Sequence, residues 1–187
     1  MISVNTDEGT YVPPPIEQKP IKNYENNEEL RILFIVRDLT NARKNLQMIL
    51  KALPIIKRKK RLFLVGKGAI NAPTVESMGY INRDKIMDLM RKMDVLIVPS
   101  LYEKIGYVGL GAYAVGLPVI TSDISSFRTN FPASHFFSPY DPQELAHIIN
   151  TFTCEELEKL GRLSWGLVES RNRQALQRLS SIYKGIK

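Results

Sequence analysis

The segment DVLIVPSLYEKIGYVGLGAYAVGLPVITSD, residues 94–123, decides the fold of this chain. It holds an apolar run at Val95–Val98, a polar turn, a stretch rich in glycine and alanine, and a second apolar run at Val119–Thr121. This order predicts a strand, a crossover helix and a neighbouring parallel strand. One carboxylate, Glu103, lies where the first strand gives way to the helix, at the sheet edge where phosphate-bearing ligands bind. The segment therefore predicts a nucleotide-binding site.

Four glycines lie in or beside this predicted helix: Gly106, Gly109, Gly111 and Gly116. Each glycine inside a helix costs about 1 kcal/mol relative to alanine, so their presence needs a cause. Either a ligand or a neighbouring backbone approaches closely, or the helix packs tightly on the sheet without any ligand. The spacing differs from the dinucleotide fingerprint G-x-G-x-x-G.

The rest of the chain repeats the alternation of strands and helices. Further strands are predicted at Arg31–Val36, Leu62–Val65, Thr74–Tyr80 and His135–Phe137. Helices are predicted at Lys44–Ile56, at Arg83–Met93 with Asn82 as cap, from Pro142 onward, and in a tail of two parts at Glu155–Gly161 and Leu167–Tyr183. Residues 30–187 should thus form an α/β, Rossmann-like doubly wound parallel sheet with helices on both faces. Residues 1–29, rich in proline and polar side chains, are predicted to be an extended leader or interdomain linker outside the core.

The composition is that of one soluble domain. The chain has 187 residues, of which 44% are hydrophobic, enough for a packed core. Its first residues are polar and acidic, and no apolar run approaches the roughly 20 residues of a membrane-spanning helix. We therefore expect a cytoplasmic protein, at most peripheral on a membrane. The single cysteine, Cys154, excludes an intrachain disulfide, and His135 and His147 lack the neighbours that a metal site needs.

The formal net charge is +7, and its densest cluster is the run Lys57–Arg61. Such a run is typical of a solvated loop. Alternatively, it contacts anionic phospholipid headgroups, where each basic residue contributes about 1 kcal/mol. We expect no nucleic-acid partner, because aromatic side chains are not interleaved with these cations.

Several short motifs follow one another along the chain. They are RILFIVR at 31–37, RKN at 43–45, LFLVGKG at 62–68, MGYI at 78–81, and VPSLYE at 98–103 followed by Gly106, Ala112, Ala114, Gly116 and PVI at 118–120. In this order, from Arg31 to Tyr183, they resemble the donor-binding C-terminal domain of GT-B fold glycosyltransferases, most closely glycosyltransferase family 4. The resemblance implies a single half-domain of that two-domain fold, with a nucleotide diphosphate sugar as donor substrate and neither a metal nor another cofactor.

The resemblance also implies roles for individual residues. Glu103 would face the donor sugar, while Arg37 and Lys44 would stabilise the departing diphosphate. The remaining donor-binding positions would be Gly66, Gly68, Gly79, Tyr80, Ile81, Gly106, Tyr107, Val108 and Gly111. The alternative for Arg37 and Lys44 is that of solvated loop cations, but their positions after a strand and before a helix favour the phosphate role. Glu103 can cap the following helix and still contact a ligand.

One position departs from the family pattern. The family carries a Glu-x7-Glu motif whose second glutamate holds the ribose hydroxyls, and Gly111 stands at that position here. A hydrogen bond to a charged group contributes about 1.5–3 kcal/mol, so its loss should weaken donor binding roughly tenfold to a hundredfold. Asp123 and Tyr113 are candidates to supply the ribose contact instead.

Three functions follow from this resemblance. The first is a glycosyltransferase, or its donor-binding domain, that transfers a hexose to a hydroxyl acceptor with retention and requires an N-terminal acceptor domain or a partner chain. The second is a non-catalytic binding or interaction module derived from that fold, of which Gly111 would be the sign. The third is a half-domain of a nucleotide-sugar epimerase.

Overall fold

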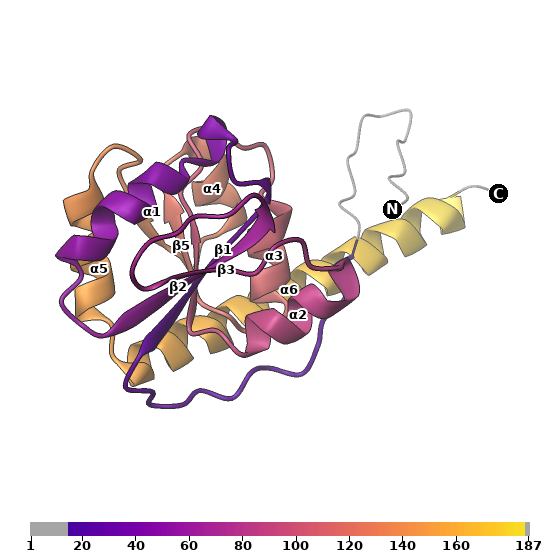
Figure 1. Cartoon of the computed structure of the whole chain (residues 1–187). Coiled ribbons are helices and arrows are strands. Elements are labelled where there is room, and N and C mark those ends of the chain that lie inside the picture. Colours follow the sequence, from indigo (N-terminus) through magenta and orange to yellow (C-terminus); the bar gives the residue numbers. More distant parts are fainter. Residues whose placement is uncertain (1–14, 186–187) are drawn as a thin grey trace.

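Six strands form one sheet in the order β3-β2-β1-β4-β5-β6, and all neighbouring strands are parallel. They are β1 (Leu30–Asp38), β2 (Lys60–Lys67), β3 (Val75–Ser77), β4 (Val95–Val98), β5 (Val119–Ser122) and β6 (His135–Phe137). The structure, a computed structural model, describes residues 15–185 (Figure 1). The sheet winds outward in opposite directions from its central strands β1 and β4, which confirms the predicted doubly wound α/β fold.

The central strands are apolar because both of their faces are covered. All four residues of β4 are buried, as are all four of β5. The register aligns Leu33 of β1 with Leu96 of β4, and Leu96 in turn with Val119 of β5. A continuous apolar layer therefore crosses the middle of the sheet, as expected for parallel strands between helices.

Helices pack against both faces of the sheet. They are α1 (Leu46–Ala52), α2 (Arg83–Arg91), α3 (Tyr107–Tyr113), α4 (Ser125–Asn130), α5 (Pro142–Thr151) and α6 (Cys154–Gly185). The buried residues of α1 and α5 share one core, whereas those of α2, α3 and α4 share the core on the opposite face. Figure 1 shows these two groups on either side of the strands, with α6 running past the second group. None of the described helices is long and apolar enough to span a membrane.

The structure differs from the predicted helices at three places. The helix expected at Lys44–Ile56 is divided into two short 3-10 turns (Ala42–Lys44 and Leu53–Ile55) with α1 between them. The backbone of Asn45 is left-handed, with φ of 56°, and Pro54 lies in the second turn, so neither end continues an α-helix. Helix α4 was not predicted, and the helical tail is continuous rather than divided.

Residues 16–24, which we call the strap, run along α3 and α6 without forming a helix or strand. The backbone N–H of Lys19 donates to the carbonyl of Ala114 at 3.1 Å, and that of Lys22 to the carbonyl of Val115 at 2.9 Å. On α6, the indole N–H of Trp165 donates to the carbonyl of Lys19 at 3.0 Å. This part of the predicted linker is therefore fixed to the domain by hydrogen bonds to α6 and to the residues that directly follow α3.

A buried charge cluster lies where the strap reaches the sheet. Asp94 accepts from the backbone N–H of Arg31 at 2.8 Å and from its guanidinium Nη2 at 2.8 Å and Nε at 3.1 Å. The ammonium of Lys22, whose side chain is 2% exposed, lies 3.9 Å from the same carboxylate. Burial lowers the pKa of Lys22, and the negative charge of Asp94 opposes that shift. The strap thus brings the buried ammonium of Lys22 to a carboxylate that is already paired with Arg31.

Candidate functional site

The candidate site lies where β1 and β4 end, next to each other at the middle of the sheet. Here the winding of the sheet reverses, and ligands of doubly wound folds bind in the crevice beyond the strands at such a point. Two loops meet there, residues 39–45 after β1 and residues 99–106 after β4. The predicted residues Lys44 and Glu103 belong to these loops.

The two loops are joined through their backbones. The N–H of Leu101 donates to the carbonyl of Arg43 at 2.9 Å, and the guanidinium of Arg43 donates to the carbonyl of Tyr102 at 3.4 Å. Asn41 caps the turn that carries Lys44, because its side chain accepts from the N–H of Arg43 at 3.2 Å. The hydroxyl of Ser126 donates to the carbonyl of Glu103 at 2.5 Å and ties the second loop to α4.

These backbone contacts bring the side chains of Lys44 and Glu103 together as an ion pair. The Lys44 side chain is 23% exposed and that of Glu103 is 18% exposed, so both are accessible to a ligand and partly shielded from water. An ammonium and a carboxylate so placed can respectively bind a phosphate oxygen and a sugar hydroxyl.

Arg37 lies near the end of β1 with an exposed side chain. Within residues 15–185 it forms no ion pair, and the structure does not join it to Lys44 or Glu103. Arg37 lies at the same edge of the sheet as Lys44 and Glu103 because it is next to the last residue of β1.

The glycine turn predicted after Val65 begins inside β2, and its first glycine, Gly66, is explained by packing. Gly66 is buried with φ of 151°, and a β-carbon there would overlap the carbonyl oxygen of Val36 on β1. Its N–H donates to the carbonyl of Gly79 at 2.9 Å, which joins the turns after β2 and β3. Gly68 is exposed, with φ of 106°. Next to Gly79, the Tyr80 ring is 74% exposed, while Ile81 packs partly into the core.

The predicted residues of α3 divide between surface and interior. Gly106 begins the helix with φ of 78°, and a β-carbon there would lie 2.9 Å from the rings of Phe127 and Phe131. This close packing against aromatic rings explains the glycine without a ligand. Tyr107 is half-exposed and Val108 is partly buried.

Gly111 faces α2 from the middle of α3. A β-carbon built there would lie 3.7 Å from Cε of Met90, an ordinary contact distance. A larger residue could therefore start at this position, and nothing in the packing requires glycine. An apolar methionine covers the position that carries a glutamate in the resembled family.

Neither suggested substitute for that glutamate is free to serve. The Tyr113 ring is buried in the core, and its hydroxyl shares a 2.9 Å hydrogen bond with Ser134. Burial raises the pKa of Tyr113 to about 12. Asp123 forms two 2.6 Å hydrogen bonds with the guanidinium of Arg128. The suggestion of Tyr113 is wrong, because the residue points into the core rather than out of it.

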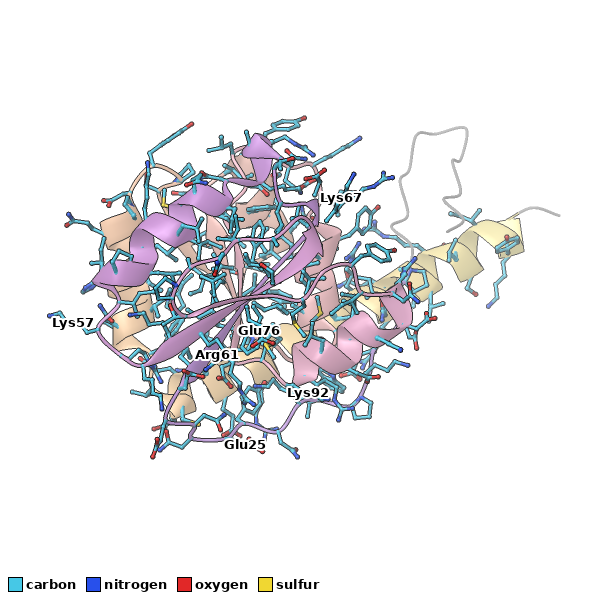
Figure 2. The ribbon with its side chains drawn as sticks, in the orientation of Figure 1. Glu25, Lys57, Arg61, Lys67, Glu76 and Lys92 are labelled. Carbon is cyan, nitrogen blue, oxygen red and sulfur yellow. The ribbon has the colours of Figure 1, made fainter. Side chains whose placement is uncertain are left out.

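Lys67 is a further candidate site residue that the sequence did not single out. It ends β2 with an exposed side chain (Figure 2). The register aligns it with Asp38 of β1, the residue after Arg37. Hydrogen bonds from Thr40, assisted by the charge of Lys67, lower the pKa of Asp38. In the sequence, Lys67 could have been recognised as a candidate from its position between Gly66 and Gly68, in the motif that resembles the glycine turn of the family.

The basic run lies away from this edge and is partly neutralised. Arg61 pairs with Glu29 at 3.0 Å and with Glu76 at 3.7 Å, and Figure 2 shows Arg61 beside Glu76 while Lys67 lies toward the other end of the strands. Lys59 lies 3.9 Å from Glu28. Contact of this run with an anionic membrane remains a prediction. Because Lys59 and Arg61 already face carboxylates, fewer of its cations are available for lipid headgroups than the sequence indicates.

Among the described residues, no group of three or more His, Cys, Asp or Glu side chains could hold a metal ion.

The chain matches the family model described as glycosyl transferases group 1 over residues 29–153. It is 29% identical over 112 residues to an uncharacterized glycosyltransferase, MJ1607, of Methanocaldococcus jannaschii, an alignment that covers 52% of this chain and 28% of the relative.

Three solved structures illustrate the similarity of fold. Sucrose-phosphate synthase of Thermosynechococcus elongatus has a TM-score of 0.72 at 20% identity, covering 85% of this chain and 46% of the other. HepE of Anabaena, in complex with UDP and glucose, has a TM-score of 0.68 at 20% identity, with coverage of 82% and 49%. TarM of S. aureus, in a complex that includes UDP, has a TM-score of 0.75 at 12% identity, with coverage of 90% and 38%. The chain thus spans less than half the length of each.

Proposed function

The chain belongs to the group 1 glycosyl transferases, and we propose that it is the donor-binding half of an enzyme that moves a sugar from a nucleotide diphosphate sugar to a hydroxyl acceptor with retention. The observation that carries the proposal is the meeting of Lys44 and Glu103 at the point where the winding of the sheet reverses. UDP, and glucose or UDP-glucose, are bound in structures of Anabaena HepE, which has a similar fold. A nucleotide-sugar donor is consistent with that similarity.

In this proposal, Lys44 and Arg37 offset the charge that develops on the departing diphosphate. Glu103 accepts a hydrogen bond from a sugar hydroxyl and orients the ring. Tyr80 offers an exposed aromatic face beside the glycine turns, where a nucleotide base can stack. The acceptor is bound by a second domain or a partner chain, since this chain covers less than half the length of the similar structures.

Titration calorimetry of the whole chain with UDP, GDP, ADP and their sugar conjugates tests the proposal. We expect one nucleotide to bind, and both Arg37→Ala and Glu103→Ala to weaken the nucleotide sugar about tenfold to a hundredfold, because each removes a charge-assisted hydrogen bond. Arg173→Ala, which removes an exposed cation from α6, should leave binding unchanged. Absence of binding to every compound at millimolar concentration would exclude a working donor site in this chain.

A second candidate function is a binding or interaction module that has lost donor affinity. The observation in its favour is Gly111, with the Met90 side chain packed where a ribose-binding carboxylate would begin. Under this alternative the chain keeps its fold and the Lys44–Glu103 contact but transfers no sugar.

Restoring the carboxylate distinguishes the two candidates. Gly111→Glu should raise the affinity for a ribonucleoside diphosphate at least tenfold over Gly111→Ala, because a charged acceptor again faces the ribose hydroxyls. The substitution is sterically feasible, since only the flexible end of Met90 lies nearby. The gain should disappear for the corresponding 2′-deoxyribonucleotide. Equal affinities of the two variants for the ribonucleotide would count against a ribose contact at this position.

A further inference from the structure

The structure pairs the two groups that the proposed function assigns to opposite ends of the donor. Lys44 is assigned to the diphosphate and Glu103 to the sugar, yet the structure places them in contact with each other. A phosphate oxygen and the Glu103 carboxylate are both anionic acceptors for the same ammonium group. The two therefore compete for Lys44.

The loops that carry this pair are held in place by other contacts. The bond between Leu101 and Arg43 is a backbone hydrogen bond, and Ser126 fixes the carbonyl of Glu103 rather than its carboxylate. Asn41 caps the turn before Lys44. Rotation of the Lys44 or the Glu103 side chain therefore suffices to open the ion pair, and it leaves these backbone contacts intact.

We propose that the Lys44–Glu103 ion pair is a latch that the diphosphate of the donor opens. The diphosphate takes the ammonium of Lys44, and the freed carboxylate of Glu103 becomes the acceptor for a hydroxyl of the attached sugar. This inference rests on the proposed function and deepens it, because it makes recognition of the sugar depend on recognition of the phosphates.

The latch has an energetic consequence that separates two kinds of ligand. A diphosphate without a sugar breaks the pair and leaves a partly buried carboxylate without its cation, which opposes binding. A nucleotide sugar supplies a partner to each of the two groups. Glu103 therefore selects against the bare diphosphate and for the conjugated one, a coupling between two parts of one ligand.

The test is titration of inorganic pyrophosphate into the whole chain, in buffer with EDTA at fixed ionic strength, because pyrophosphate probes the phosphate contacts without base or sugar. Glu103→Gln keeps the side-chain shape and removes the competing charge, so we expect it to bind pyrophosphate about three- to tenfold more tightly than the wild type. The same variant should bind the nucleotide sugar more weakly.

Two controls isolate the latch. Glu28→Gln makes the same change in net charge at a 93% exposed side chain two residues before β1, and should alter pyrophosphate affinity by less than twofold. In a Lys44→Met background, Glu103→Gln should give no further gain, because the cation for which the two anions compete is absent.

The outcomes separate this inference from the proposed function. Pyrophosphate binding that Glu103→Gln weakens, or strengthens no more than Glu28→Gln does, overturns the latch and leaves the donor site in place. Failure of the wild type and every variant to bind pyrophosphate or any nucleoside diphosphate overturns the donor site and the latch together.

Discussion

Replacing Asp94 with alanine is expected to lower the free energy of unfolding by about 3 kcal/mol, because it leaves two cations without their shared carboxylate. Lys22 is almost fully buried and cannot recover hydration without displacing the strap. Arg31 is about a quarter exposed, which places the loss at the lower end of the usual range for a broken buried pair. Urea unfolding of the whole chain at neutral pH measures the change.

Lys22→Met is the matched control, since it also removes one charge from the cluster. Asp94 then keeps its hydrogen bonds to Arg31, and the apolar side chain suits the buried position. We expect this variant to lie within about 1 kcal/mol of the wild type. Similar losses in both variants would show that the cluster does not act through the uncompensated charge.

Gly161→Ala is expected to cost about 2–3 kcal/mol, although alanine is the better helix former. A β-carbon at this position of α6 would overlap the hydroxyl of Tyr24 and the carbonyl oxygen of Gly116. The hydroxyl itself donates to that carbonyl at 2.5 Å, so the tyrosine fits into a slot made by the two glycines. Since one of the overlapped atoms is backbone, rotation of Tyr24 alone cannot relieve the overlap.

Gly166, five residues further along the same helix, provides the comparison. A β-carbon there would meet nothing within 4 Å, so Gly166→Ala should stabilise the chain by about 1 kcal/mol. Thermal unfolding of the two variants should shift the midpoint in opposite directions. Shifts of the same sign would contradict the assignment of the slot to Gly161.

The central strands could be predicted because burial on both faces makes them continuous apolar runs. Val95–Val98 and Val119–Thr121 were recognised in this way, and the structure extends the second by one residue. Helix α4 was not recognised, because SSFRTN buries only Phe127 and lacks a repeating apolar face. The predicted parts of α6 were separated at residues 162–166, which the structure keeps helical. Gly161 marks the place where Tyr24 packs against the helix and not a helix end.

The site was predictable only as a set of loops at one edge of the sheet. Glu103 and Lys44 lie 59 positions apart in the chain, and their contact depends on β1 and β4 being neighbours, which local patterns do not specify. The sequence also did not specify which side chains of the short helix α3 point into the core. Tyr113 was therefore wrongly proposed for a ligand contact. The strap escaped recognition because most of its bonds use backbone groups, which leave no trace in composition.

The sheet is bounded by its two shortest strands, β3 and β6, with three residues each. A long exposed border would offer a row of unpaired N–H and C=O groups on which a strand from another molecule could assemble. Such short borders offer little template for that process. The arrangement of strand lengths therefore protects the protein against edge-to-edge aggregation, independently of any ligand.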